Sequence, residues 1–106
     1  MASAAEQGPP APAYLVLAFR IVDPEPFLDY ARRIPALIAR HRGRYIVKGA
    51  HPTAIEGGWA PDRLVILEFE SRANAGAFLE DAEARDLFAL RHRGTDGNLI
   101  LVDGCR

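Results

Sequence analysis

Short apolar runs alternate along the chain with segments in which apolar residues recur every three or four positions. Runs rich in β-branched, aliphatic and aromatic residues predict strands at residues 14–22, 44–48, 63–70 and 98–102. The spacing of three and four predicts a helix between the first two strands. Asp23 would cap this helix, and Gly43 would follow its end.

Two shorter helices are predicted between the third and fourth strands. Ser71 would cap the first of them, and the second would cover about residues 83–93. Residues 49–52 predict a bulge or corner, and residues 57–62 and 94–97 predict turns. The β-α-β-β-α-β order predicts an α+β, ferredoxin-like sandwich, in which a four-stranded antiparallel sheet carries helices on one face.

The predicted strands are apolar on both faces, although the predicted helices can cover only one. In the first strand, Leu15 and Leu17 alternate with Tyr14 and Val16. An uncovered apolar sheet face favours a homodimer in which two sheets pack face to face. The alternative is a monomer whose edge loops fold over the sheet.

Length and composition indicate one globular domain, which we place at residues 13–104 after a flexible tail at residues 1–12. The 13 Lys and Arg residues balance 14 Asp and Glu residues, so nucleic acid and membrane surfaces are not expected partners. No apolar run is long enough to span a membrane, and the first residues do not resemble a secretory signal. The lone Cys105 cannot form an internal disulfide, which favours a cytoplasmic location.

Charged residues within apolar strands are candidates for a site. Arg20, Glu68 and either Lys48 or Arg44 are expected on the second sheet face. There they would form a structural Arg–Glu pair or a polar spot inside an apolar cavity.

His41 and Glu68 are the candidate catalytic acid or base. His41 would otherwise cap carbonyl groups or pack at the end of its helix. Burial would raise the pKa of Glu68, and an adjacent arginine would lower it.

The candidate ligand-binding residues are Arg20, Trp59, Arg63 and Arg91. Arg63 and Arg91 could clamp a carboxylate or phosphate, or they could form salt bridges with neighbouring acids. Trp59 could close over a planar ligand or contact a partner subunit. The three histidines lack metal-site spacing, and no glycine-rich phosphate loop is present, so neither a metal nor a cofactor is expected.

The central segment carries a distinctive pattern, E-G-x-W-x-P-x-R-x-V-x-x-E-F, which begins at Glu56. This pattern, with Gly43-Arg44-Tyr45 before it and a closing Leu-Val-Asp-Gly104, resembles domain-of-unknown-function family 1330 of the dimeric α/β-barrel superfamily. The resemblance covers residues 14–104. It implies a bacterial, cytoplasmic homodimer with packed sheets and helices outside, and it implies no particular reaction.

Two functional hypotheses follow. In the first, the homodimer binds a small aromatic or acidic metabolite and transforms it without a cofactor, by proton transfer or oxygen chemistry. In the second, it is a non-catalytic binding or accessory module. An enzyme should contain an enclosed cavity with a titratable group, whereas a module should have a filled barrel and paired charges.

Overall fold

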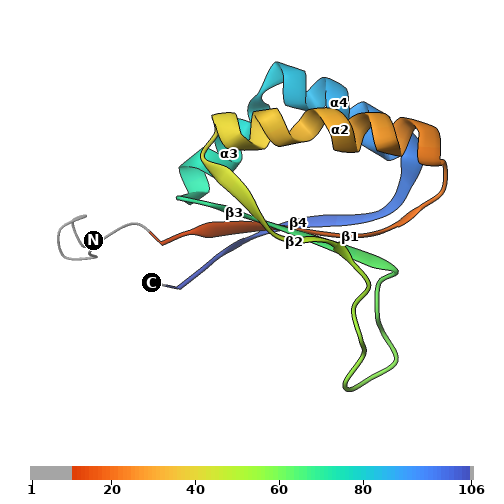
Figure 1. Ribbon diagram of the computed structural model, residues 1–106. Helices are drawn as coiled ribbons and strands as arrows, with labels where there is room; N and C mark the ends of the chain where they lie inside the picture. The colour runs from red at the N-terminus through yellow and green to blue at the C-terminus, as the bar shows by residue number, and fades with distance from the viewer. Residues whose placement is uncertain (1–10, 106) are drawn as a thin grey trace.

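The computed structural model describes residues 11–105, and the predicted tail therefore lies almost wholly outside the described residues. Four strands, β1 (Ala13–Ile21), β2 (Gly43–Ala50), β3 (Arg63–Phe69) and β4 (Thr95–Asp103), form one antiparallel sheet in the order β2-β3-β1-β4. The helices α2 (Pro24–Arg40), α3 (Arg72–Glu80) and α4 (Ala82–Gly94) cover one face of that sheet (Figure 1). The ferredoxin-like α+β fold expected from the element order is confirmed. None of the helices within residues 11–105 has the length and hydrophobicity needed to cross a membrane.

The core lies between the helices and the sheet. Its largest fully buried side chains are Leu15, Ile34, Ile38, Phe69 and Phe78. The rings of Phe69 on β3 and Phe78 on α3 lie 5.3 Å apart between centroids, so they join the sheet to the short helix. The apolar stripe of α2 and the odd-numbered residues of β1 meet in this layer, as their spacing predicts.

The last strand is longer than its sequence pattern indicates. The expected turn at residues 94–97 is wrong, because β4 begins at Thr95 and pairs with Ile21 at the end of β1. The chain reverses tightly at Gly94, whose carbonyl accepts hydrogen bonds from the backbone N–H groups of Val22 (2.8 Å) and Asp23 (3.2 Å). A Cβ atom at Gly94 would lie 2.7 Å from the backbone nitrogen of Phe27, so only glycine fits this approach.

Strand β2 contains two irregularities that change which residues face the helices. Its register with β3 shifts between Tyr45 and Val47 and again between Lys48 and Ala50. Gly49, at a φ of 78°, provides the left-handed backbone of the second irregularity. As a result Lys48 pairs with Val65, whose side chain faces the helices, whereas Arg44 pairs with Glu68 on the opposite face.

The sheet face away from the helices is apolar and open in the single chain. Ile100 is 58% exposed, and Val102 and Ile46 are also exposed. The segment that connects β2 and β3, residues 51–62, projects beyond this same side of the sheet as an arm (Figure 1). The arm carries two exposed large apolar side chains, Ile55 at 87% and Trp59 at 72%.

Candidate ligand-binding site

A cavity of about 210 Å³ lies between α2 and the helix-covered face of the sheet. We call it the main cavity. Its apolar walls come from β1, β3 and α2, and they include Leu17, Phe19, Phe27, Ile38, Val65 and Leu67. The polar side chains that line it are those of Tyr30, Tyr45, Lys48 and Arg63.

The two cations of the main cavity have no carboxylate partner among residues 11–105. Arg63 makes a long hydrogen bond from Nη1 to the carbonyl oxygen of Gly49, at 3.4 Å. The ammonium of Lys48 lies 4.6 Å from the centre of the Tyr45 ring. The salt bridge between Arg63 and a neighbouring acid, the alternative considered above, is therefore not formed.

The tyrosines of the main cavity are hydrogen-bond donors at neutral pH. Burial, followed by the nearby Tyr30, raises the pKa of Tyr45 to about 12. A phenol with that pKa keeps its proton at pH 7 and can donate it in a hydrogen bond. Within residues 11–105 no Asp, Glu or His side chain lines the main cavity, so the ionised groups described there are all cations.

Arg91 lines a much smaller chamber of about 20 Å³ next to the main cavity. The two spaces share four lining residues, Leu17, Tyr30, Val65 and Leu67. The guanidinium of Arg91 lies 4.9 Å from the Phe88 ring centre and 5.6 Å from that of Tyr30. Arg63 and Arg91 therefore line two adjacent spaces rather than one, and the clamp hypothesis stays a prediction.

Arg20 and Trp59 line a different, shallow hollow near the base of the arm. Arg20 Nη2 donates to Asp96 Oδ2 at 3.3 Å, and both side chains are exposed. The Trp59 side chain does not fold back on the core. These two predicted ligand-binding residues lie together, but they do not line the main cavity.

Glu68 lies on the helix-free face and accepts two hydrogen bonds. Arg44 Nε donates at 2.7 Å and the Tyr14 hydroxyl donates at 3.0 Å. These bonds, first that of Arg44, lower the pKa of Glu68. The expected Arg–Glu pair on this face therefore exists, with Arg44 rather than Arg20 as its cation, while Lys48 lies on the other face.

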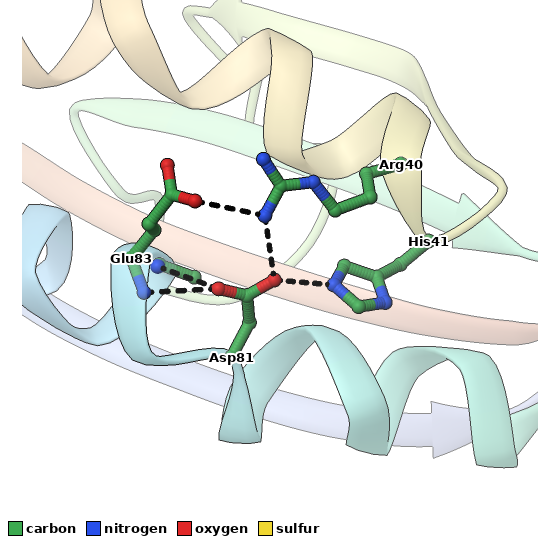
Figure 2. Close-up of polar contacts among 5 residues, drawn as sticks. Arg40, His41, Asp81 and Glu83 are labelled. Carbon is green, nitrogen blue, oxygen red and sulfur yellow. Dashed lines mark hydrogen bonds and ion pairs between the residues drawn. The ribbon is translucent and has the colours of Figure 1, made fainter.

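His41 belongs to a polar cluster at the end of α2, which we call the junction cluster (Figure 2). Its Nε2 donates to Asp81 Oδ2 at 2.7 Å. Arg40 Nη1 lies 3.2 Å from both Asp81 Oδ2 and Glu83 Oε1. Asp81 also caps α4 by accepting the backbone N–H groups of Glu83 and Ala84. Neither His41 nor Glu68 lines the main cavity, and their catalytic roles stay predictions.

Sequence reasoning missed Tyr30 and Tyr45 as residues of the site and expected Lys48, as an alternative to Arg44, on the opposite sheet face. The signal for Lys48 was present in the adjacent glycine, because a bulge at Gly49 moves neighbouring side chains between faces. Tyr30 and Tyr45 were read only as parts of apolar patterns. Their hydroxyl groups become informative once both rings face one cavity.

Fold and cavity together define a small ferredoxin-like α+β protein with a cationic, aromatic-lined pocket beneath its helices. The chain belongs to the family described as Domain of unknown function (DUF1330), which matches residues 12–105. No protein with a curated description matches the sequence.

Three solved structures share the fold at low sequence identity. RPA0582, a protein of unknown function from Rhodopseudomonas palustris, has a TM-score of 0.75 and 18% identity, over 91% of this chain and 84% of that one. AT3G17210, a hypothetical protein from Arabidopsis thaliana, has a TM-score of 0.62 and 12% identity, over 98% and 96% of the two chains. SnoaB from Streptomyces nogalater, a cofactor-independent oxygenase, has a TM-score of 0.60 and 13% identity, over 91% and 95%.

Proposed function

We propose that this protein is a homodimer that binds a small aromatic or acidic anion in the main cavity. The observation that carries this proposal is the pair of cations, Lys48 and Arg63, which face an apolar cavity without carboxylate partners among the described residues. Lys48 is exposed and Arg63 is half-buried, so water can solvate both when no ligand is bound, and a ligand anion that displaced this water would supply their counter-charge.

The size and walls of the main cavity favour a ligand with one ring. A cavity of about 150 Å³ lined by apolar side chains can hold benzene, and the main cavity measures about 210 Å³. Phe19, Phe27 and Tyr45 offer ring faces and edges against which an aromatic ligand would pack. All four polar side chains donate hydrogen bonds, so the ligand's polar groups would be acceptors.

The homodimer is supported by the helix-free face and the arm. An exposed apolar sheet face is a surface that a second, equivalent sheet would cover. Glu68 and Arg44 on that face are already hydrogen-bonded to each other, as are Arg20 and Asp96, and these groups would not enter an interface unpaired. Ile55 and Trp59 on the projecting arm would then contact the partner subunit.

Cofactor-independent oxygen chemistry is the second function that we propose for the same cavity. The described part of the chain contributes no Asp, Glu or His to the lining, and therefore no carboxylate or imidazole base. It offers cations and phenol donors that would stabilise a phenolate or enolate form of the substrate. The cofactor-independent oxygenase SnoaB, which has a similar fold, supports this function by analogy alone. If no turnover occurs, the protein is a non-catalytic binding module that uses the same site.

Native mass spectrometry of the full chain, purified gently from its host, tests binding and assembly together. We expect a species of twice the 11.6 kDa chain mass with additional small-molecule mass. The double variant Lys48→Met, Arg63→Met should remain dimeric and lose the additional mass. Ile100→Glu, on the helix-free face, should produce monomers. A monomeric wild-type protein would contradict the proposed assembly, and a small molecule retained by the double variant would contradict the proposed site.

Oxygen uptake tests the second function. The purified dimer is mixed with hydroxy-aromatic acids in air-saturated buffer, and dissolved oxygen is followed with an electrode. Uptake that the double variant abolishes would support the oxygenase, whereas binding without uptake would favour the non-catalytic module. His41→Gln and Glu68→Gln are assayed in the same way to test the catalytic roles predicted for those residues. Substitution of a catalytic group should reduce oxygen uptake and leave the dimer intact.

A further inference from the structure

Arg91 is the single charged side chain that is buried among residues 11–105, with 6% of its surface exposed. Its guanidinium makes one side-chain hydrogen bond, from Nη2 to Nε2 of the adjacent His92, at 3.3 Å. No carboxylate within the described part of the chain forms an ion pair with it. A guanidinium has five N–H donors, so most of its hydrogen-bonding capacity is left for another partner.

The rings of Phe88 and Tyr30 stabilise the Arg91 cation in part. Its Cζ lies 4.9 Å and 5.6 Å from the two ring centres. Aromatic faces attract a cation but accept few hydrogen bonds, and an arginine buried without a carboxylate is costly. The sequence hypothesis that Arg91 pairs with a nearby acid such as Asp86 is not realised, since no such contact forms.

The chamber beside Arg91 has room for one or two oxygen-sized atoms. Its volume is about 20 Å³, and about 10–15 Å³ holds one water molecule. The chamber lies next to the main cavity along β1. Phe19 and Leu17 line the main cavity, and Leu17 and Leu15 line the chamber. Exposed Lys48 and half-buried Arg63 belong to the main cavity alone, whereas buried Arg91 belongs to the chamber alone.

We propose that Arg91 binds the carboxylate of an aromatic acid whose ring fills the main cavity and whose second oxygen substituent faces Arg63 and Lys48. This inference rests on the proposed binding function and names its ligand class. An ionised carboxylate fits because it supplies the missing negative charge and accepts two parallel N–H bonds from the guanidinium fork. The chamber is too small for a phosphate with its additional oxygens. A ligand with polar groups at both ends of a ring matches cations in two adjacent spaces that share four lining residues.

Isothermal titration calorimetry of the full chain with two probes tests the proposal. The probes are 4-hydroxybenzoate and 4-hydroxybenzyl alcohol. The alcohol carries a neutral hydroxymethyl group in place of the carboxylate of the acid. We expect wild-type protein to bind the acid at least roughly tenfold more tightly than the alcohol. Arg91→Met should weaken acid binding by roughly ten- to hundredfold and leave alcohol binding unchanged. Arg93→Met, which removes an exposed arginine of the same helix, is the matched control and should change neither.

The possible results distinguish failure of the carboxylate subsite from failure of the proposed binding function on which it rests. If wild type binds both probes equally and Arg91→Met changes neither, the carboxylate subsite is wrong and the binding cavity stands. If neither probe binds to wild type, both proposals are wrong. If Arg91→Met fails to fold, Arg91→Lys is measured instead. Lysine keeps the positive charge but lacks the two parallel N–H donors of the guanidinium. Weaker acid binding with unchanged alcohol binding in that variant supports the subsite, and unchanged selectivity overturns it.

Discussion

The junction cluster and the main cavity differ in whether their positively charged side chains have carboxylate partners. In the junction cluster, Arg40 and His41 each contact a carboxylate, and Asp81 receives hydrogen bonds from both of them (Figure 2). Along the main cavity and its chamber, Lys48, Arg63 and Arg91 have no carboxylate partner among residues 11–105. The chain has 14 acidic and 13 basic residues, so the unpaired cations do not reflect a shortage of carboxylates.

This difference separates charges that stabilise the fold from charges for which we propose a ligand. Asp81 joins α2 to the first turn of α4 and satisfies backbone donors there, so its charge is used within the chain. The cations of the cavity join no two elements through an ion pair. Substitutions in the junction cluster should therefore affect stability most, and substitutions in the cavity should affect binding most.

Asp81→Ala should cause the largest loss of stability. The substitution removes the N-cap of α4 together with the partner of His41 and Arg40. We expect the melting temperature, followed by circular dichroism, to fall by several degrees. Glu83→Ala, which removes only an exposed contact with Arg40, is the control and should have a small effect. An unchanged melting temperature in Asp81→Ala would show that the junction cluster does not hold the helices.

The contribution of the Asp81 charge should depend on pH. The hydrogen bond from His41, supported by backbone N–H groups, lowers the pKa of Asp81 to about 2 from an ordinary 3.8. Since the folded state binds its proton less readily than the unfolded chain, the stabilisation is complete above the ordinary pKa and is lost as pH falls towards about 2. Urea unfolding of wild type and Asp81→Asn, which keeps a capping oxygen, should therefore converge over that interval. A constant difference would contradict this assignment.

We expect the second largest effect on stability from the ionisation of Tyr45 at high pH. Burial, and then Tyr30, raises its pKa to about 12, so it stabilises the fold fully below the ordinary value of 10.0 and progressively less as pH rises to about 12. An ultraviolet titration of phenolate should show a group with this pKa that disappears in Tyr45→Phe. Tyr14→Phe is a necessary control, because the hydrogen bond to Glu68 also raises the pKa of Tyr14. A Tyr45 that titrates at its ordinary pKa would contradict the buried, proton-donating cavity wall.

Arg63→Met should have the smallest effect on stability. The substitution keeps most of the side-chain volume, removes a cation without a carboxylate partner and loses one long hydrogen bond to Gly49. We expect the free energy of unfolding in urea to change by no more than about 0.5 kcal/mol. A loss as large as that of Asp81→Ala would mean that Arg63 fastens β2 to β3, and the contrast between the two regions would disappear.

Most of the fold follows from sequence periodicity. Alternation in β1 and the three-to-four spacing in α2 report directly on which side chains meet in the core. The caps at Asp23 and Ser71 are local interactions within a few residues, and both are present. The end of α4 was harder to predict, because the tight reversal at Gly94 depends on the start of α2, far away in sequence.

The site was only partly predictable, because its residues are selected by pairing between distant segments. Arg63 and Arg91 were identified by their chemistry, and the structure places them in two adjacent spaces. The contact of His41 with Asp81 joins residues 40 positions apart, and that of Arg44 with Glu68 depends on the register between β2 and β3. Residue types suggest candidates, but only the register and the bulges determine which face each side chain occupies.

The irregular β2 strand has a consequence for how this site could change over generations. Regular pairing from Tyr45 onwards would place Lys48 opposite Leu64, on the face away from the helices, whereas the shift after Tyr45 places it opposite Val65. Losing the codon of the one extra residue between Tyr45 and Lys48 would restore regular pairing and still leave Lys48 opposite Val65, so the cavity would keep its ammonium. The bulge therefore lets this strand gain or lose one residue before Lys48 over generations while the proposed site keeps the same lining side chains.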